Sequence, residues 1–162
     1  MPDLVSPSRD YFIYLLGLLT WLGLIVAAPI MASYPSTEPL SRPIYYMSSW
    51  FCHQRPERSL SLLGQPLAVC ARCTFMYLGV TISSAVISVL PRNRPRRTYL
   101  FIAATPLVID GTTQLLGLRE SDNFLRAVTG LIFGAALAFY IAPEAEETVR
   151  QLRARIWKKT HH

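Results

Sequence analysis

The sequence CHQRPERSLSLLGQPLAVCARC, residues Cys52–Cys73, organises the rest of this chain. It holds all three cysteines, the only histidine outside the C-terminal pair, and three of the arginines. Apolar segments long enough to cross a bilayer lie on both sides of it. We therefore predict a small polytopic membrane protein that builds one polar site at one membrane face.

The composition supports an integral membrane domain. The chain has 162 residues, of which 51% are hydrophobic and 16% charged, whereas soluble domains average about 25% charged residues. The net charge is +6, but the arginines flank apolar segments, which favours contacts with lipid headgroups over a nucleic-acid partner. We predict one integral membrane domain over residues 1–162, with membrane lipids as partners and no nucleic acid.

Four apolar segments predict four transmembrane helices, because a helix needs about 20 apolar residues to cross the bilayer. These segments are residues 11–31, 74–90, 98–118 and 124–142. Two shorter apolar pieces, residues 44–51 and 60–69, predict one or two short interfacial helices between the first and second spans. Residues 143–162 form a basic amphipathic tail. The predicted fold class is an all-α, four-helix membrane bundle.

Basic residues predict the orientation, because loops rich in Lys and Arg stay in the cytoplasm. The densest basic segments are residues 92–97 and the tail. Both termini are then cytoplasmic in a prokaryotic cell membrane, and the motif loop 52–73 and the turn 119–123 are extracytoplasmic. The polar residues of the motif loop, of the end of the third span and of the turn before the fourth span then all lie at this outer face.

The cysteines allow several interpretations, which the sequence leaves open. Cys70 and Cys73 form a CxxC pair, and Cys52 with His53 could complete a Cys3His set for tetrahedral zinc, although adjacent side chains do not easily ligate one metal. Alternatively, Cys52 forms a structural disulfide with Cys70 or Cys73. A redox-active pair at a helix N-terminus beside Arg72, or thiols that only pack, are the remaining alternatives.

Arginines near the same face predict an anion site, because guanidinium groups bind phosphate or carboxylate bidentately. With Gln114 we expect them to bind a lipid phosphate. The candidates are Arg55, Arg58, Arg72, Arg119 and Arg126. The alternative is that they pair with Glu57, Glu120 and Asp122 and contact headgroups non-specifically.

Asp110 lies within the third predicted span, where an ionisable residue is costly and is a functional candidate. At helical spacing Asp110, Gln114 and Gly117 share one face. We predict that Asp110 and His53 are the proton-handling groups, or that Asp110 is a metal ligand. The alternative is a buried ion pair between Asp110 and Arg126 that joins two helices.

Small residues recur every four positions in the fourth predicted span, at Gly130, Gly134 and Ala138. Such a stripe lets two membrane helices approach closely. We expect it to pack within one chain.

The motifs CHQRPERS, CARCT and IDGTTQLLGLRESDNFLRAVTGLIFG resemble the bacterial and archaeal membrane proteins catalogued as domain of unknown function 2085. The resemblance covers roughly residues 49–134, and it departs from the family at Phe75, where the pattern usually has Gly. It implies no activity. More weakly, the order of polar residues from Asp110 to Gly130 is similar to that of VanZ-like membrane proteins, which are associated with teicoplanin resistance.

Two classes of function follow from these patterns. One is a membrane enzyme or binding protein for an anionic lipid or lipid-linked phosphate at the extracytoplasmic face. The other is an accessory subunit of a membrane complex, with a structural zinc or disulfide clasp, or a thiol redox or metal-handling protein. The sequence leaves open whether the protein is an enzyme.

Overall fold

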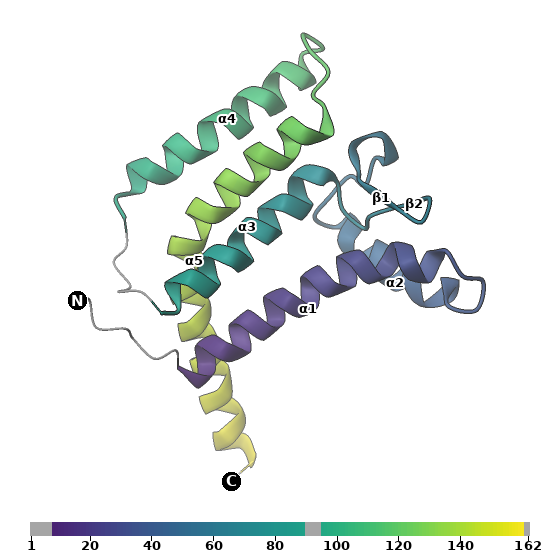
Figure 1. Cartoon of the computed structure of the whole chain (residues 1–162). Helices are drawn as coiled ribbons and strands as arrows, with labels where there is room; N and C mark the ends of the chain where they lie inside the picture. The colour runs from purple at the N-terminus through teal and green to yellow at the C-terminus, as the bar shows by residue number, and fades with distance from the viewer. Residues whose placement is uncertain (1–7, 90–94, 161–162) are drawn as a thin grey trace.

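The computed structural model describes residues 8–89 and 95–160 (Figure 1). The described residues form α1 (Arg9–Ala32), α2 (Glu38–Ser49), the short 3-10 helix η1 (Pro56–Arg58), β1 (Ser61–Leu62), β2 (Gln65–Pro66), α3 (Ala71–Ile87), α4 (Arg97–Leu115) and α5 (Asn123–Thr160). The last residue of the second predicted span, half of the basic loop 92–97 and the His161–His162 pair lie outside the described residues.

Among the described residues, two helices, α1 and α5, are long and apolar enough to cross a membrane. Helix α1 begins where Ser8 accepts a hydrogen bond of 3.1 Å from the Tyr11 N–H, which satisfies a donor of its first turn. Only 17% of the most apolar stretch of α1, and 28% of that of α5, is buried inside the protein. Their apolar side chains therefore face outward, as expected of helices surrounded by lipid.

The structure supports two of the four predicted spans and does not confirm the other two. Helix α3 is apolar but has 17 residues, fewer than the roughly 20 that cross the hydrocarbon core of a bilayer. Helix α4 has 19 residues, but its C-terminal part contains Asp110, Thr112, Thr113 and Gln114, which lower its apolar character.

The connection between α1 and α3 contains helix α2, the 3-10 helix η1 and one hairpin. Helix α2 begins before the predicted segment 44–51, because Pro39 is compatible with a first helical turn. Residues 60–69 form no helix: β1 pairs with β2 in an antiparallel hairpin. Its turn places Leu63 and Gly64 at φ values of 53° and 78°, where glycine is the residue of lowest strain.

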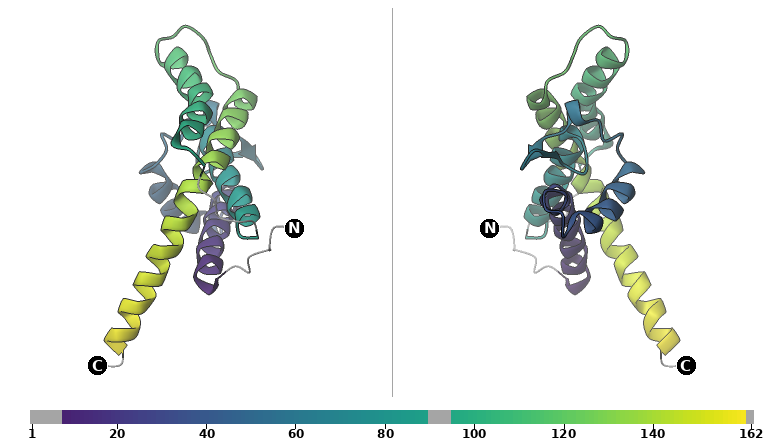
Figure 2. Two further views of the ribbon diagram at one scale, coloured as in Figure 1. Left: turned by 90° about the vertical axis from the view of Figure 1, so that its left-hand side faces the viewer. Right: turned by 90° about the vertical axis from the view of Figure 1, so that its right-hand side faces the viewer.

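Helix α5 continues through Pro143 to Thr160, so the predicted fourth span and the predicted basic tail belong to one continuous helix. Figure 2 shows the C-terminal half of α5 extending beyond the other helices. An ion pair of 3.1 Å between Arg153 and Asp10 joins this half to the first turn of α1. The tail is therefore anchored to the helices of the bundle.

Helices α3 and α5 are in close backbone contact. A Cβ atom at Gly130 or Gly134 would lie within 3.0 Å of the backbone of Arg72 or Met76, and one at Gly79 would meet the backbone of α5. This confirms the predicted packing of the small-residue stripe within one chain. The close contact forms at the start of α3 even though Phe75 stands where the family usually has Gly.

The helices alternate in direction, so the same end of the bundle receives the C-terminal ends of α1 and α4 and the N-terminal ends of α3 and α5 (Figure 1). The connection 33–70 and the turn 116–122 both lie at this end. The polar motifs are thereby brought together.

We expect Gly134→Leu to destabilise the protein by about 3 kcal/mol. This value is in the upper part of the range for overpacked positions, because the new side chain would meet backbone atoms of Met76, which cannot rotate away. Thermal unfolding in one detergent measures the effect. The matched control is Gly17→Leu, because nothing lies within 4 Å of a Cβ at that position, and we expect a change within about 1 kcal/mol. Equal effects of the two substitutions would show that the close helix contact is absent.

Candidate functional site

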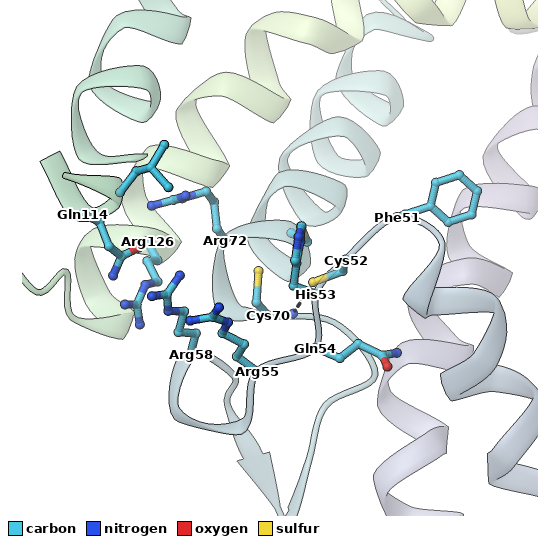
Figure 3. Close-up of a pocket in the computed structure, with 12 residues that line it drawn as sticks. Phe51, Cys52, His53, Gln54, Arg55, Arg58, Cys70, Arg72, Gln114 and Arg126 are labelled. Carbon is cyan, nitrogen blue, oxygen red and sulfur yellow. Dashed lines mark hydrogen bonds between the residues drawn. The ribbon is translucent and has the colours of Figure 1, made fainter. Parts of the chain in front are cut away.

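A cavity of about 360 Å³ lies at the end of the bundle where the polar motifs meet (Figure 3). Every predicted site residue lines it except Asp110 and Arg119. The sequence analysis did not single out three further lining residues, Phe51, Gln54 and Leu115. The lining side chains come from the motif loop, the start of α3, the end of α4 and the start of α5.

Gln54 fixes the motif loop. Its side-chain amide donates hydrogen bonds to the backbone oxygens of Tyr45, at 2.6 Å, and Ala68, at 2.8 Å, and its own backbone has a φ of 48°. The Tyr45 hydroxyl also donates to the Pro66 oxygen at 2.6 Å. These bonds tie α2 to the hairpin. The one signal for Gln54 in the sequence was its place between His53 and Arg55 in the motif.

The three cysteines form a compact cluster, with their sulfurs all within 4.8 Å of one another and with no disulfide. Cys52 is buried, and its sulfur accepts a 3.2 Å hydrogen bond from the backbone N–H of Cys70, the N-cap residue of α3. Hydrogen bonds from the Cys70 and Cys73 thiols lower the pKa of the Cys52 thiol. The three cysteines could hold a metal ion.

His53 is exposed and is not among the ligand atoms of this cluster, although it lines the same cavity. The structure therefore brings together the three sulfurs of the predicted Cys3His set, but not the imidazole.

Of the residues that the structure describes, four arginines line the cavity, and no aspartate or glutamate does. Figure 3 shows Arg55, Arg58 and Arg126 directed into the same space, with Arg72 above them in this view. Arg126 is 6% exposed; its Nη1 donates to Asn123 Oδ1 at 2.9 Å, but its buried Nε has no partner. The cavity thus holds positive charge and an unused buried donor.

The predicted pairing of these arginines with nearby acids is not present within residues 8–89 and 95–160. No ion pair joins Arg55, Arg58 or Arg126 to Glu57, Glu120 or Asp122 there. Asp122 instead accepts a 2.7 Å hydrogen bond from the Leu125 N–H in the first turn of α5. Its carboxylate therefore caps a helix.

Asp110 forms an ion pair with Arg72 on α3, not with Arg126. The carboxylate is buried and lies outside the lining of the main cavity. Asp110 Oδ1 and Arg72 Nε have no hydrogen-bond partner. This pair joins α4 to α3 and holds one of the four guanidinium groups in place.

Arg119 is exposed and lines a neighbouring cavity of about 580 Å³, which it shares with Arg55, Arg58, Gln114 and Arg126. The two cavities have several lining residues in common, so Arg119 stands at the outer edge of the candidate site.

The profile of a family described as "Predicted membrane protein (DUF2085)" matches residues 52–140, more than half of the chain. The chain belongs to this family. The match begins at Cys52 and ends in α5, so it includes every residue that lines the main cavity except Phe51. It confirms the family resemblance, and the two long apolar helices agree with a membrane protein.

Curated relatives in archaea share the sequence over most of their length. An uncharacterised protein of Methanocaldococcus jannaschii is 40% identical over 144 residues, which cover 84% of this chain and 92% of the relative. One of Methanothermobacter thermautotrophicus is 42% identical over 91 residues, 55% of this chain and 82% of the relative. No solved structure matches the chain. The weaker resemblance to VanZ-like proteins stays a prediction.

We expect Asp110→Asn to destabilise the protein by about 3 kcal/mol, since removing one partner of a buried ion pair leaves the other charge uncompensated. Chemical or thermal unfolding in detergent measures the loss. The matched control is Glu38→Gln, which removes the exposed ion pair with Arg42 and should change stability by less than about 1 kcal/mol. Similar losses in both variants would refute a structural role for the Arg72–Asp110 pair.

Proposed function

We propose that this membrane protein binds the phosphate group of an anionic lipid, or of a lipid-linked phosphate, in the arginine-lined cavity. The observation that carries the proposal is Arg126: it is 6% exposed, its Nε has no partner, and it lines a cavity with three further arginines and no carboxylate. An anion in the cavity would supply the charge and the hydrogen-bond acceptors that the protein does not.

The energetics favour an occupied cavity. A buried donor without a partner costs about 1–3 kcal/mol, and like charges that converge in a medium of low dielectric constant repel one another. A phosphate removes both costs, because its oxygens accept bidentate hydrogen bonds from guanidinium groups. The cavity volume of about 360 Å³ also lies within the range of roughly 300–1,000 Å³ that is usual for ligand sites.

The residues divide into different roles in this proposal. Arg55, Arg58 and Arg126 contact the phosphate directly, and Gln114 adds an amide donor. Asp110 positions Arg72 through their ion pair. His53 is the proton-handling candidate that lines the cavity, so a reaction on the bound phosphate would use this residue.

The membrane placement is part of the proposal: α3 and α4 cross the bilayer together with α1 and α5, both termini are cytoplasmic, and the cavity opens at the extracytoplasmic face. In support, the four helices lie side by side (Figure 1). Tyr46, Trp50 and Phe51, beside the cavity end, are exposed, and aromatic side chains concentrate at membrane–water interfaces. The cavity would then lie at the depth of lipid headgroups.

A second candidate function is that of a non-enzymatic accessory subunit in a membrane complex, with the cysteines as a zinc clasp. The close approach of Cys52, Cys70 and Cys73 favours it. Purification with partner proteins in fixed stoichiometry, and no phosphate-dependent stabilisation, would support this alternative over lipid binding.

We expect phosphate to raise the unfolding temperature of the detergent-purified protein, and Arg126→Gln and Arg58→Gln to weaken this binding. The expected loss in affinity is about tenfold or more for each variant, because hydrogen bonds to charged groups contribute about 1.5–3 kcal/mol. Titration with inorganic phosphate, and with nanodiscs that contain phosphatidic acid, measures it. Arg42→Gln is the control, since Arg42 is exposed on α2 and pairs with Glu38.

The two ligand sources give different results. Binding of phosphatidic acid nanodiscs but not of nanodiscs with phosphatidylcholine alone indicates a lipid ligand, and binding of inorganic phosphate alone indicates a free phosphate. The absence of binding in both titrations, or equal losses in the Arg126 and Arg42 variants, would contradict the proposed function.

For the orientation, we expect a membrane-impermeant maleimide to label Glu120→Cys in intact cells, above the background of the unsubstituted protein. Gln151→Cys should be labelled only after the membrane is permeabilised. Glu120 lies in the turn before α5 and Gln151 in the C-terminal half of α5, and both are exposed. Labelling of both in intact cells, or the reverse pattern, would refute the four-span topology as oriented here.

A further inference from the structure

We propose that Cys52, Cys70 and Cys73 bind one zinc ion as three thiolates, and that its fourth coordination position opens into the arginine-lined cavity, where a phosphate oxygen occupies it. The phosphate ligand rests on the proposed function, whereas the metal site stands on the cysteine geometry alone.

The sulfur positions fit a single metal ion. Tetrahedral zinc with Zn–S bonds of about 2.3 Å needs sulfurs roughly 3.8 Å apart, and here all three lie within 4.8 Å of one another. Cys70 and Cys73 flank the first turn of α3, and Cys52 is brought to them by the motif loop that Gln54 fixes. Side-chain rotations can close the remaining difference.

The number of ligands indicates an open site. Structural zinc sites have four protein ligands, whereas sites that bind water or a substrate have three. Within the described part of the chain, no histidine, further cysteine or carboxylate lies close enough to the three sulfurs to be a fourth ligand. His53 is therefore not part of the group. Cys52, Cys70 and Cys73 all line the cavity, and on this basis we place the fourth position toward its interior.

A backbone hydrogen bond holds the sulfur of Cys52 in position. The Cys70 backbone N–H donates to Cys52 Sγ at 3.2 Å, a contact of the kind that orients and tunes metal ligands. The cluster also lies at the N-terminus of α3, which has 17 residues and no side-chain hydrogen bond at its cap. The N–H groups and the dipole of a helix's first turn stabilise negative charge nearby.

The charges of the metal site and the cavity complement each other. Three thiolates and Zn²⁺ carry a net charge of −1, while the four lining arginines carry +4, of which Asp110 offsets one through its ion pair with Arg72. The arginines thus hold the anion next to the metal despite the negative thiolates. Binding is a ligand exchange without redox chemistry: the thiols release protons as zinc binds, and one phosphate oxygen replaces the bound water.

Elemental analysis and thiol counting of the full-length protein in detergent test the metal site. We expect about one zinc ion per chain and thiols that react only after chelation. Cys52→Ser, Cys70→Ser and Cys73→Ser should each lose the metal, while His53→Ala should retain it. Two thiols that appear only after reduction, with no metal, would overturn the proposal, and so would metal loss in His53→Ala. Chelation and reconstitution of the unsubstituted protein give the answer if the cysteine variants do not fold.

Replacement of zinc by Co²⁺ tests the open position. Inorganic phosphate should change the visible absorption of the cobalt protein, sodium chloride at equal ionic strength should not, and Arg126→Gln should raise the phosphate concentration needed by about tenfold. Phosphate that stabilises the protein without a spectral change would make the metal a closed clasp: the inference fails and the proposed function stands. Bound cobalt with neither stabilisation nor a spectral change would overturn the phosphate ligand and the proposed function together.

Discussion

The close approach of α3 and α5 is the constraint on which the site depends. Gly130 and Gly134 leave room for the backbone of Arg72 and Met76, and Gly79 does the same from the other helix. Arg126 lies one turn before Gly130 on the same face of α5. The close backbone contact that these glycines allow therefore also places Arg126 beside the first turn of α3, where Cys73 and Arg72 are located.

The other parts of the site are attached to this helix pair. The Arg72–Asp110 ion pair joins α4 to α3, and Gln54 holds the motif loop against α2 and the residues before α3. A cavity results in which Arg72 is paired but Arg55, Arg58 and Arg126 have no ion-pair partner among the described residues. Such an arrangement costs free energy unless an anion occupies it, and this cost is the physical basis of the proposed anion site.

Periodic and compositional patterns predicted the helical class, the membrane character and the packing stripe, because these follow from local hydrophobicity and residue size. The boundaries were less predictable. Pro143 does not end α5, because the helix continues past it to residues that pair with α1. Residues 60–69 form a hairpin, because Gly64 allows the turn conformation that two short strands need. Composition alone predicted four spans, of which the structure supports two, since α3 is short and α4 is partly polar.

The sequence by itself determined which side chains are available for chemistry: three cysteines, one histidine and the arginines of the motifs, all assigned to one end of the bundle by the alternation of apolar and polar segments. Only the tertiary structure decided which of them meet. It grouped the three sulfurs without His53, paired Asp110 with Arg72 instead of Arg126, and left Arg126 Nε unpartnered. The physical reason is that these partners lie far apart in the chain, so their contacts depend on how helices and loops pack, which no local pattern encodes.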